Sequence, residues 1–209
     1  MSAATKTLGP YAVHPSVAMV RKWLEELPEK TGRTLEEWIA LTKDSGPPTE
    51  KERREWLKKE HKLGTNSAWW IAERADGKGT REFDSPEEYL KAAAEWVEAQ
   101  YSDPRAALRP LYEQLLKLGF SLGKDVKASP CRTMVPLYRN HVFAQIKPAT
   151  NTRIDLGFAL GNMKTPKRLI DTGGYAKKDR ITRRIEVKSK ADIDDEIRRW
   201  LKKAYELDE

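Results

Sequence analysis

The chain changes its hydrophobic period part-way along, and this change limits its fold more than any other feature of the sequence. Two Thr-x-x-Glu capping boxes, Thr34–Glu37 and Thr49–Glu52, predict helix starts, because the threonine hydroxyl accepts the N3 amide while the glutamate reaches back. Ser85, followed by a proline and two glutamates, predicts a third start. From residue 131 onward, apolar and polar residues alternate, which is typical of strands. The sequence therefore predicts a helical part followed by a part that contains a sheet.

Apolar residues at helical spacing extend these three starts into helices and indicate two further helices. We expect Pro28 to end the first of them, because proline removes a backbone donor and crowds the preceding turn. The helices are expected over residues 15–28, 34–44, 49–62, 65–75 and 85–100. Residues 1–101 are thus predicted to form a helical bundle and to be the first of two domains.

Residues 61–71 have the helix, glycine turn and polar helix start of a helix-turn-helix. In DNA-binding versions the second helix enters the major groove, where Asn66 and Ser67 would meet base edges. Arg74 is the only basic residue of that second helix, and residues 1–100 carry 16 Lys and Arg against 18 Asp and Glu. Because phosphate contacts need cations, we interpret this element as a structural elbow, with Trp69 and Trp70 in the core.

Residues 102–209 are predicted to form an α+β domain. A helix over 103–119 is followed by four alternating segments, at 131–138, 142–146, 152–160 and 180–189, and by a final helix from Asp192. Short connections favour an antiparallel meander, and the two helices can cover one of its faces. The expected fold class is α+β: an N-terminal helical bundle followed by a four-stranded antiparallel sheet flanked by helices.

Charge and strand alternation together indicate a ligand surface. Residues 101–191 carry 19 Lys and Arg against 7 Asp and Glu, and such a surplus favours a polyanionic partner. Alternation places cations and rings on the face away from the helices, with Arg183 as a misfit on the inner face. Rings stack on bases and cations contact phosphates, so this face suits single-stranded nucleic acid. The predicted ligand-binding residues are Arg132, Tyr138, Phe143, Lys147, Arg153, Arg184 and Lys188, with basic residues of the loop 161–179 and Arg180 extending the surface.

The leading hypothesis is a non-enzymatic protein that binds nucleic acid or another polyanion. The alternative is a protein-interaction adaptor, in which Tyr138 and Phe143 are covered by the helical domain or by a protein partner. A third hypothesis is a Mg²⁺-dependent nuclease, because Asp155 and the Glu186-x-Lys188 pair could hold a metal and steady an attacking water. Whether these three residues form a metal site is left open, as is the possibility of an ordinary solvated sheet face.

No other pattern indicates a cofactor or a catalytic group. The three histidines are scattered without metal-ligand spacing, Cys131 has no evident base, and no phosphate loop is present. The chain has one cysteine, no apolar run of about 20 residues and no signal-peptide pattern at its start. We therefore expect no cofactor, no bound metal, no membrane partner and a cytoplasmic location.

Two stretches resemble known families. Residues 14–75, from His14-Pro-Ser-Val-Ala-Met to Asn66-Ser-Ala-Trp-Trp-Ile71, resemble a bacterial helical domain catalogued only as of unknown function. Residues 104–207 resemble the uncharacterised domain that often accompanies it, through the motifs Leu108-Arg-Pro-Leu-Tyr112, Val135 to Phe143, 148–157 and Asp179-Arg-Ile-Thr182.

The order helix, strands, helix is also similar to the YdhG-like group, which is linked to iron handling, and to the MmcQ/YjbR-like double-wing group, for which DNA binding is proposed. Frataxin-type iron binding uses an acidic ridge, and the basic segment 101–191 departs from it. These resemblances imply the α+β fold and carry no catalytic residues over to this chain.

Overall fold

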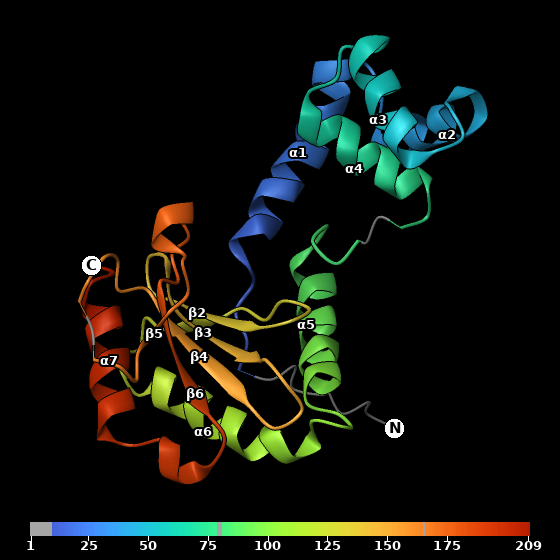
Figure 1. The fold of residues 1–209 in the computed structure, drawn as a ribbon. Coiled ribbons are helices and arrows are strands. Elements are labelled where there is room, and N and C mark those ends of the chain that lie inside the picture. The colour runs from blue at the N-terminus through green and yellow to red at the C-terminus, as the bar shows by residue number, and fades with distance from the viewer. Residues whose placement is uncertain (1–9, 79–80, 165) are drawn as a thin grey trace. The chain divides into compact units, whose positions relative to one another are not determined.

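Two compact units make up the computed structural model, which describes residues 10–78, 81–164 and 166–209 (Figure 1). A helical unit comprises Pro15–Tyr89, and an α+β unit comprises the residues up to His14 together with Leu90–Glu209. The helical unit is therefore an insertion in the sequence of the α+β unit. No described helix has the length and apolar character needed to cross a bilayer.

The helical unit contains α1 (Pro15–Thr31), α2 (Leu35–Ser45), α3 (Glu50–Lys59) and α4 (Thr65–Ala75). Both capping boxes are formed as predicted. The expected end at Pro28 is wrong, because α1 continues to Thr31. Because Pro28 has no backbone N–H, the helix loses one hydrogen bond at this position. The helix ends at Gly32, which has φ +74° and donates its backbone N–H to the Pro28 carbonyl at 2.8 Å.

Leu27, Trp38, Leu57 and Ile71 form the centre of the helical unit and are almost fully buried. Their burial removes apolar surface from water at about 25 cal/mol per Å². Contrary to expectation, Trp69 is not part of this core: its side chain is 41% exposed, and the Arg54 guanidinium lies 5.4 Å from its ring centre.

An open, entirely antiparallel sheet forms the middle of the α+β unit, with strand order β1-β2-β3-β4-β6-β5. It has six strands rather than the four predicted. The two additional strands lie at the edges of the sheet, and each has only two residues, which is too short for an alternating pattern to appear in the sequence. The strands are β1 (Lys127–Ala128), β2 (Val135–Tyr138), β3 (Val142–Pro148), β4 (Ile154–Phe158), β5 (Ile170–Asp171) and β6 (Arg183–Val187).

Helices α6 (Arg109–Phe120) and α7 (Asp195–Glu206) pack on one face of this sheet (Figure 1). Gly119 allows α6 to approach closely, since a Cβ at this position would lie 2.6 Å from Leu137 Cδ1. The remaining elements are α5 (Pro86–Gln100), η1 (Ala106–Leu108), η2 (Tyr175–Lys177) and η3 (Lys190–Asp192). We call the helix-covered face of the sheet the inner face and the opposite one the outer face.

Arg183 lies on the inner face, as predicted, and is 7% exposed. Its guanidinium donates to the carbonyls of Thr182 and Met163 and lies 3.0 Å from the Asp171 carboxylate. These partners compensate the burial of a charge that would otherwise be costly.

Candidate nucleic-acid interface

A β-bulge in β3 decides which rings reach the outer face. Tyr138 pairs with Val142 and Leu137 with Ala144, so Phe143 is the extra residue between two ladder pairs. The bulge places Val142 beside Tyr138 on the outer face and turns Phe143 into the core. Phe143 is fully buried and packs edge-on against Tyr205 of α7, with ring centres 5.7 Å apart. The expectation that Phe143 is presented on the outer face is therefore wrong.

Three of the predicted binding cations belong to an ionic network on β4, β6 and the residues directly beside these strands. We define this network as Arg153, Asp155, Arg184, Glu186 and Lys188. Arg153 lies 2.9 Å from the Asp155 carboxylate and 3.0 Å from that of Glu186. Arg184 lies 3.1 and 3.0 Å from the same two carboxylates, and Lys188 Nζ is 3.3 Å from Glu186. Hydrogen bonding from Arg184 is the main cause that holds the pKa of Glu186 below its usual range. Most of the positive charge expected here is thus compensated within the face.

The same network bears on the nuclease hypothesis. Asp155 and Glu186 are direct cross-strand partners, as the sequence pattern suggested. The Arg153 guanidinium contacts both carboxylates, where a divalent cation would need their oxygens as ligands. Within the described residues, no group of three or more His, Cys, Asp or Glu side chains is arranged to hold a metal ion. The residues present do not fit a magnesium centre.

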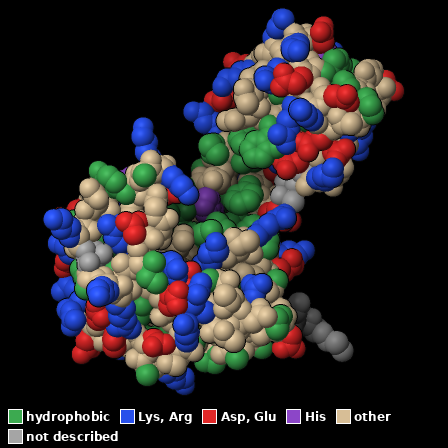
Figure 2. All heavy atoms as spheres, viewed as in Figure 1, with side chains coloured by type: hydrophobic (Ala, Val, Ile, Leu, Met, Phe, Trp, Pro, Cys, Tyr) green, Lys and Arg blue, Asp and Glu red, His purple; other side chains and the backbone are tan. Residues whose placement is uncertain are grey.

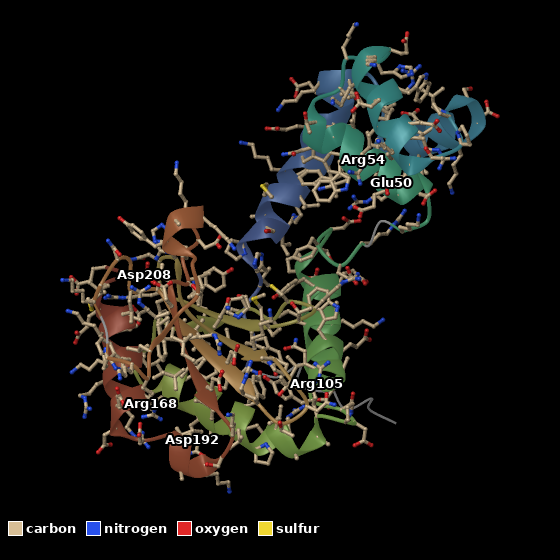
Figure 3. The ribbon with its side chains drawn as sticks, in the orientation of Figure 1. Glu50, Arg54, Arg105, Arg168, Asp192 and Asp208 are labelled. Carbon is tan, nitrogen blue, oxygen red and sulfur yellow. The ribbon has the colours of Figure 1, made fainter. Side chains whose placement is uncertain are left out.

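The other two predicted cations line a hollow that we call the basic pocket. Arg132, just before β2, and Lys147 of β3 are joined there by Arg105, which precedes η1 (labelled in Figure 3). The pocket has a volume of about 340 Å³, and its remaining lining consists of Ala99, Gln100, Thr133 and Pro148. No acidic side chain is among these lining residues. Three cations from three separate segments therefore converge on one concave surface.

Tyr138 lies in a second hollow, the tyrosine pocket, further along the outer face of β2 and β3. This pocket has a volume of about 470 Å³, and Met134, Pro136, Val142 and Gln145 contribute to its lining. Its wall opposite these strands comes from Thr172, Asp179, Arg180 and Ile181 of the loop before β6, which packs so closely that a Cβ on Gly157 would lie 2.6 Å from Ile181 Cγ2.

The Tyr138 hydroxyl lies 2.9 Å from His14 Nε2, and the two rings meet edge-on. Burial raises the pKa of Tyr138 to about 12 and lowers the pKa of His14. Both groups are therefore neutral at pH 7. Burial also raises the pKa of the neighbouring Cys131 thiol, which keeps it protonated and unreactive.

The two pockets follow one another along β3, which contributes Lys147 to the basic pocket and Val142 to the tyrosine pocket. Lys147 at one end and Val142 at the other are separated by roughly 15 Å, at about 3.3 Å per residue. The space-filling view shows Lys, Arg, Asp and Glu side chains interspersed over much of the α+β unit (Figure 2). The basic pocket brings three cations together, whereas a hollow beside α6 contains two, Lys117 and Arg198, and also lacks acids in its lining.

The loop 161–182 contributes less positive charge than its sequence suggests. Arg168 is bound by Asp194 at 2.6 Å and Glu196 at 2.9 Å, and it donates to the Asp192 carbonyl, which fixes the start of α7 (Figure 3). Arg180 is bound by Asp208 at 2.6 Å. Lys164, Lys167, Lys177 and Lys178 are exposed, and none has an ion pair among the described residues.

Sequence reasoning missed Arg105 and His14 as members of these pockets. Arg105 was assigned to a helix, and only the turn before η1 brings it beside Lys147. His14 lies over 100 residues from Tyr138 in sequence, so no local pattern could have joined them.

Comparison with protein families gives two matches. Residues 20–77 match a domain of unknown function, DUF4287, and residues 97–208 match another, DUF5655. The chain belongs to the DUF5655 family. The DUF5655 match spans the whole sheet together with α6 and α7, and it leaves out His14, which forms part of the tyrosine pocket. The expectation of two domains of unknown function is confirmed. No curated protein and no solved structure matches the chain.

Proposed function

We propose that this protein binds single-stranded nucleic acid, without cleaving it, along the outer face of β2 and β3. The observation that carries the proposal is the basic pocket, where Arg105, Arg132 and Lys147 converge without an acidic neighbour in the lining. Phosphate contacts supply most of the affinity in such complexes, and they require cations. Arg105 and Lys147 have no ion pair among the described residues, so both are able to contact a phosphate.

The tyrosine pocket supports the same proposal by offering a surface for a base. A base that stacks on Tyr138 would contact apolar neighbours such as Val142 and Pro136, while Gln145 can hydrogen-bond to its edge. Because Tyr138 and His14 are neutral, they can accommodate an uncharged base. A strand bound in this way would place phosphates in the basic pocket and a base roughly 15 Å away, from the strand rise of about 3.3 Å per residue.

The ionic network limits this surface to β2 and β3. Its arginines already contact Asp155 and Glu186, so a phosphate would have to replace a carboxylate that lies about 3 Å away. Arg153, Arg184 and Lys188 therefore form the boundary of the proposed surface rather than its centre.

The adaptor alternative receives less support. It expects the helical domain or a protein partner to cover Tyr138 and Phe143. Phe143 is buried, but the core of its own unit covers it, with Tyr205 of α7 in contact. A protein that docked on the outer face would contact the half-buried Tyr138, and it would also contact charged side chains of the basic pocket and of the ionic network.

Fluorescence anisotropy with a labelled single strand of about 12 nucleotides tests the proposal, since one small domain covers about 4–16 nucleotides. The double variant R105Q/K147Q should bind about tenfold more weakly, and the slope of log affinity against log salt should fall by about 1.4, or about 0.7 per lost phosphate contact. The matched double variant K190Q/K203Q removes the same charge outside the pocket and should change the affinity less than threefold, since exposed charges are screened beyond about 10 Å.

A second pair of variants tests the base-stacking surface. Y138F should keep the affinity, whereas Y138A should lose about 1–3 kcal/mol of binding free energy because it removes the ring. Absence of binding at low salt, or equal losses in the two double variants, would show that the proposal is wrong.

A further inference from the structure

The tyrosine pocket contains two polar side chains whose hydrogen-bonding capacity is unused. Gln145 of β3 and Asp179 of the loop before β6 both line this hollow of about 470 Å³. Among the described residues, the Gln145 carboxamide makes no hydrogen bond, and the exposed Asp179 carboxylate has neither a hydrogen bond nor an ion pair. We infer that the pocket selects a base that carries an exocyclic amine and discriminates against uracil and thymine. This inference rests on the proposed function, in which a base stacks on Tyr138.

A ligand can reach the polar atoms of Gln145. The side chain is half-buried, but its amide oxygen and nitrogen are not enclosed. Its cross-strand partners are Pro136 and Gly157, so it has an apolar ring on one side and no side chain on the other. A Cβ on Gly157 would lie 2.9 Å from Gln145 Cγ, so glycine leaves room for this side chain. The paired strands thus fix where the amide is presented.

The hydroxyl groups and the cation that also line the tyrosine pocket already have partners. The Thr172 hydroxyl donates to a backbone carbonyl at 2.8 Å, and the Tyr138 hydroxyl lies 2.9 Å from His14 Nε2. The Arg180 guanidinium donates to the Asp208 carboxylate at 2.6 Å. The two unused side chains therefore offer a base one amide nitrogen as a donor and three oxygens as acceptors.

This excess of acceptors is complementary to a base with an amine. Adenine and cytosine present an exocyclic NH₂ beside a ring nitrogen that accepts, and guanine presents an NH₂ beside a ring N–H. Each of these bases can donate to both unused side chains. Uracil and thymine have a single ring N–H between two carbonyls, so a carbonyl oxygen would face an acceptor and weaken binding. The negative charge of Asp179 also favours a base over a phosphate in this pocket.

Fluorescence anisotropy with strands of about 12 cytidines and of about 12 uridines tests the inference on the full chain at low salt. The two strands have the same phosphates and rings of the same size, and they differ in the cytosine amine, which is a carbonyl in uracil. The cytidine strand should bind tighter by about fivefold or more, which is the lower bound for one well-formed pair of hydrogen bonds to a base. Tighter binding of the uridine strand would overturn the inference.

The variant D179N separates hydrogen bonding from charge. Its amide can donate to a uracil carbonyl, so the ratio of the two affinities should fall below about twofold. The lost negative charge acts on both strands alike and cancels from this ratio. E95Q neutralises an exposed acid of α5 outside the pocket and should leave the ratio as in the wild type. The same ratio in D179N and in the wild type would also overturn the inference.

The proposed function and the preference for an amine fail in different ways. If neither strand binds at low salt, the proposed function is wrong, and the base preference is overturned with it. If both strands bind with equal affinity, nucleic-acid binding is retained and only the selection of an amine is overturned.

Discussion

The carboxylate of Asp208 lies 2.7 Å from the backbone nitrogen of His141 and accepts its N–H (Figure 3). This hydrogen bond connects the segment after α7 to the turn between β2 and β3. The same side chain accepts the backbone N–H of Asn140 at 3.0 Å and the Arg180 guanidinium at 2.6 Å. Asp208 is 3% exposed. This carboxylate therefore connects three segments that are far apart in the sequence.

D208A should lower the free energy of unfolding by about 2–3 kcal/mol, because it leaves backbone donors and a guanidinium without their charged acceptor. Urea unfolding followed by circular dichroism measures the change. E206Q, which alters an exposed acid on the same helix end, is the matched control and should cost less than about 0.5 kcal/mol. Similar losses in the two variants would contradict the role assigned to Asp208.

The stabilisation by Asp208 should depend on pH. Burial acts to raise the pKa of Asp208, but the hydrogen bonds from His141 and the charge of Arg180 outweigh it, and the pKa is lowered overall. A carboxyl group with a lowered pKa stabilises the fold above its unfolded pKa of about 3.9, and this contribution is lost as the pH falls through the folded pKa. The difference in stability between wild type and D208N should therefore be smaller at pH 3 than at pH 5. A difference that grows between pH 5 and pH 3 would contradict this assignment.

The β3 bulge predicts unequal costs of substitution at two neighbouring residues. F143A should lower the free energy of unfolding by about 3–5 kcal/mol, because it opens a cavity in the core beside Tyr205. V142A removes a half-buried side chain from the outer face and should cost about 1 kcal/mol or less. Chemical denaturation of both variants measures the difference. Equal costs would mean that the two side chains share a similar environment, contrary to the register described above.

Neutralising one acid of the ionic network should strengthen binding of a nucleic acid. E186Q removes a carboxylate that lies close to Arg153, Arg184 and Lys188. The net charge of the outer face rises by one, and the affinity for a single strand should increase about twofold at low salt and converge with that of the wild type as salt is added. Anisotropy titrations at several salt concentrations measure this effect, and a decrease in affinity would contradict the position of the network at the edge of the binding surface.

Helix starts could be predicted from the sequence because capping is a local property. Thr34 and Thr49 each form the capping box that their spacing indicates. Pro28 was misjudged because one proline in a last turn costs little when Gly32 follows at the correct distance. The edge strands β1 and β5 could not be predicted, because pairing with β2 and β6 defines them and two residues carry no period.

The candidate site was predicted less completely than the fold. Alternation assigned Tyr138 to the outer face correctly, but a single inserted residue reversed the faces of Val142 and Phe143. Counting charges located the basic half of the chain and could not show that Arg153 and Arg184 face carboxylates on neighbouring strands. Pairing across strands and contacts across long sequence distances decide both points.

The short segment before the helical unit has a practical consequence. Ala12 donates its backbone N–H to the Ala128 carbonyl at 2.8 Å, and Tyr11 and His14 contact Tyr112 and Tyr138 through their side chains. A fragment trimmed to residues 97–208 would keep every position of the matched family and still lose these anchors. Recombinant versions intended for ligand screening should therefore retain the stretch from residue 10 onward, or the hollow around Tyr138 will be missing one of its walls.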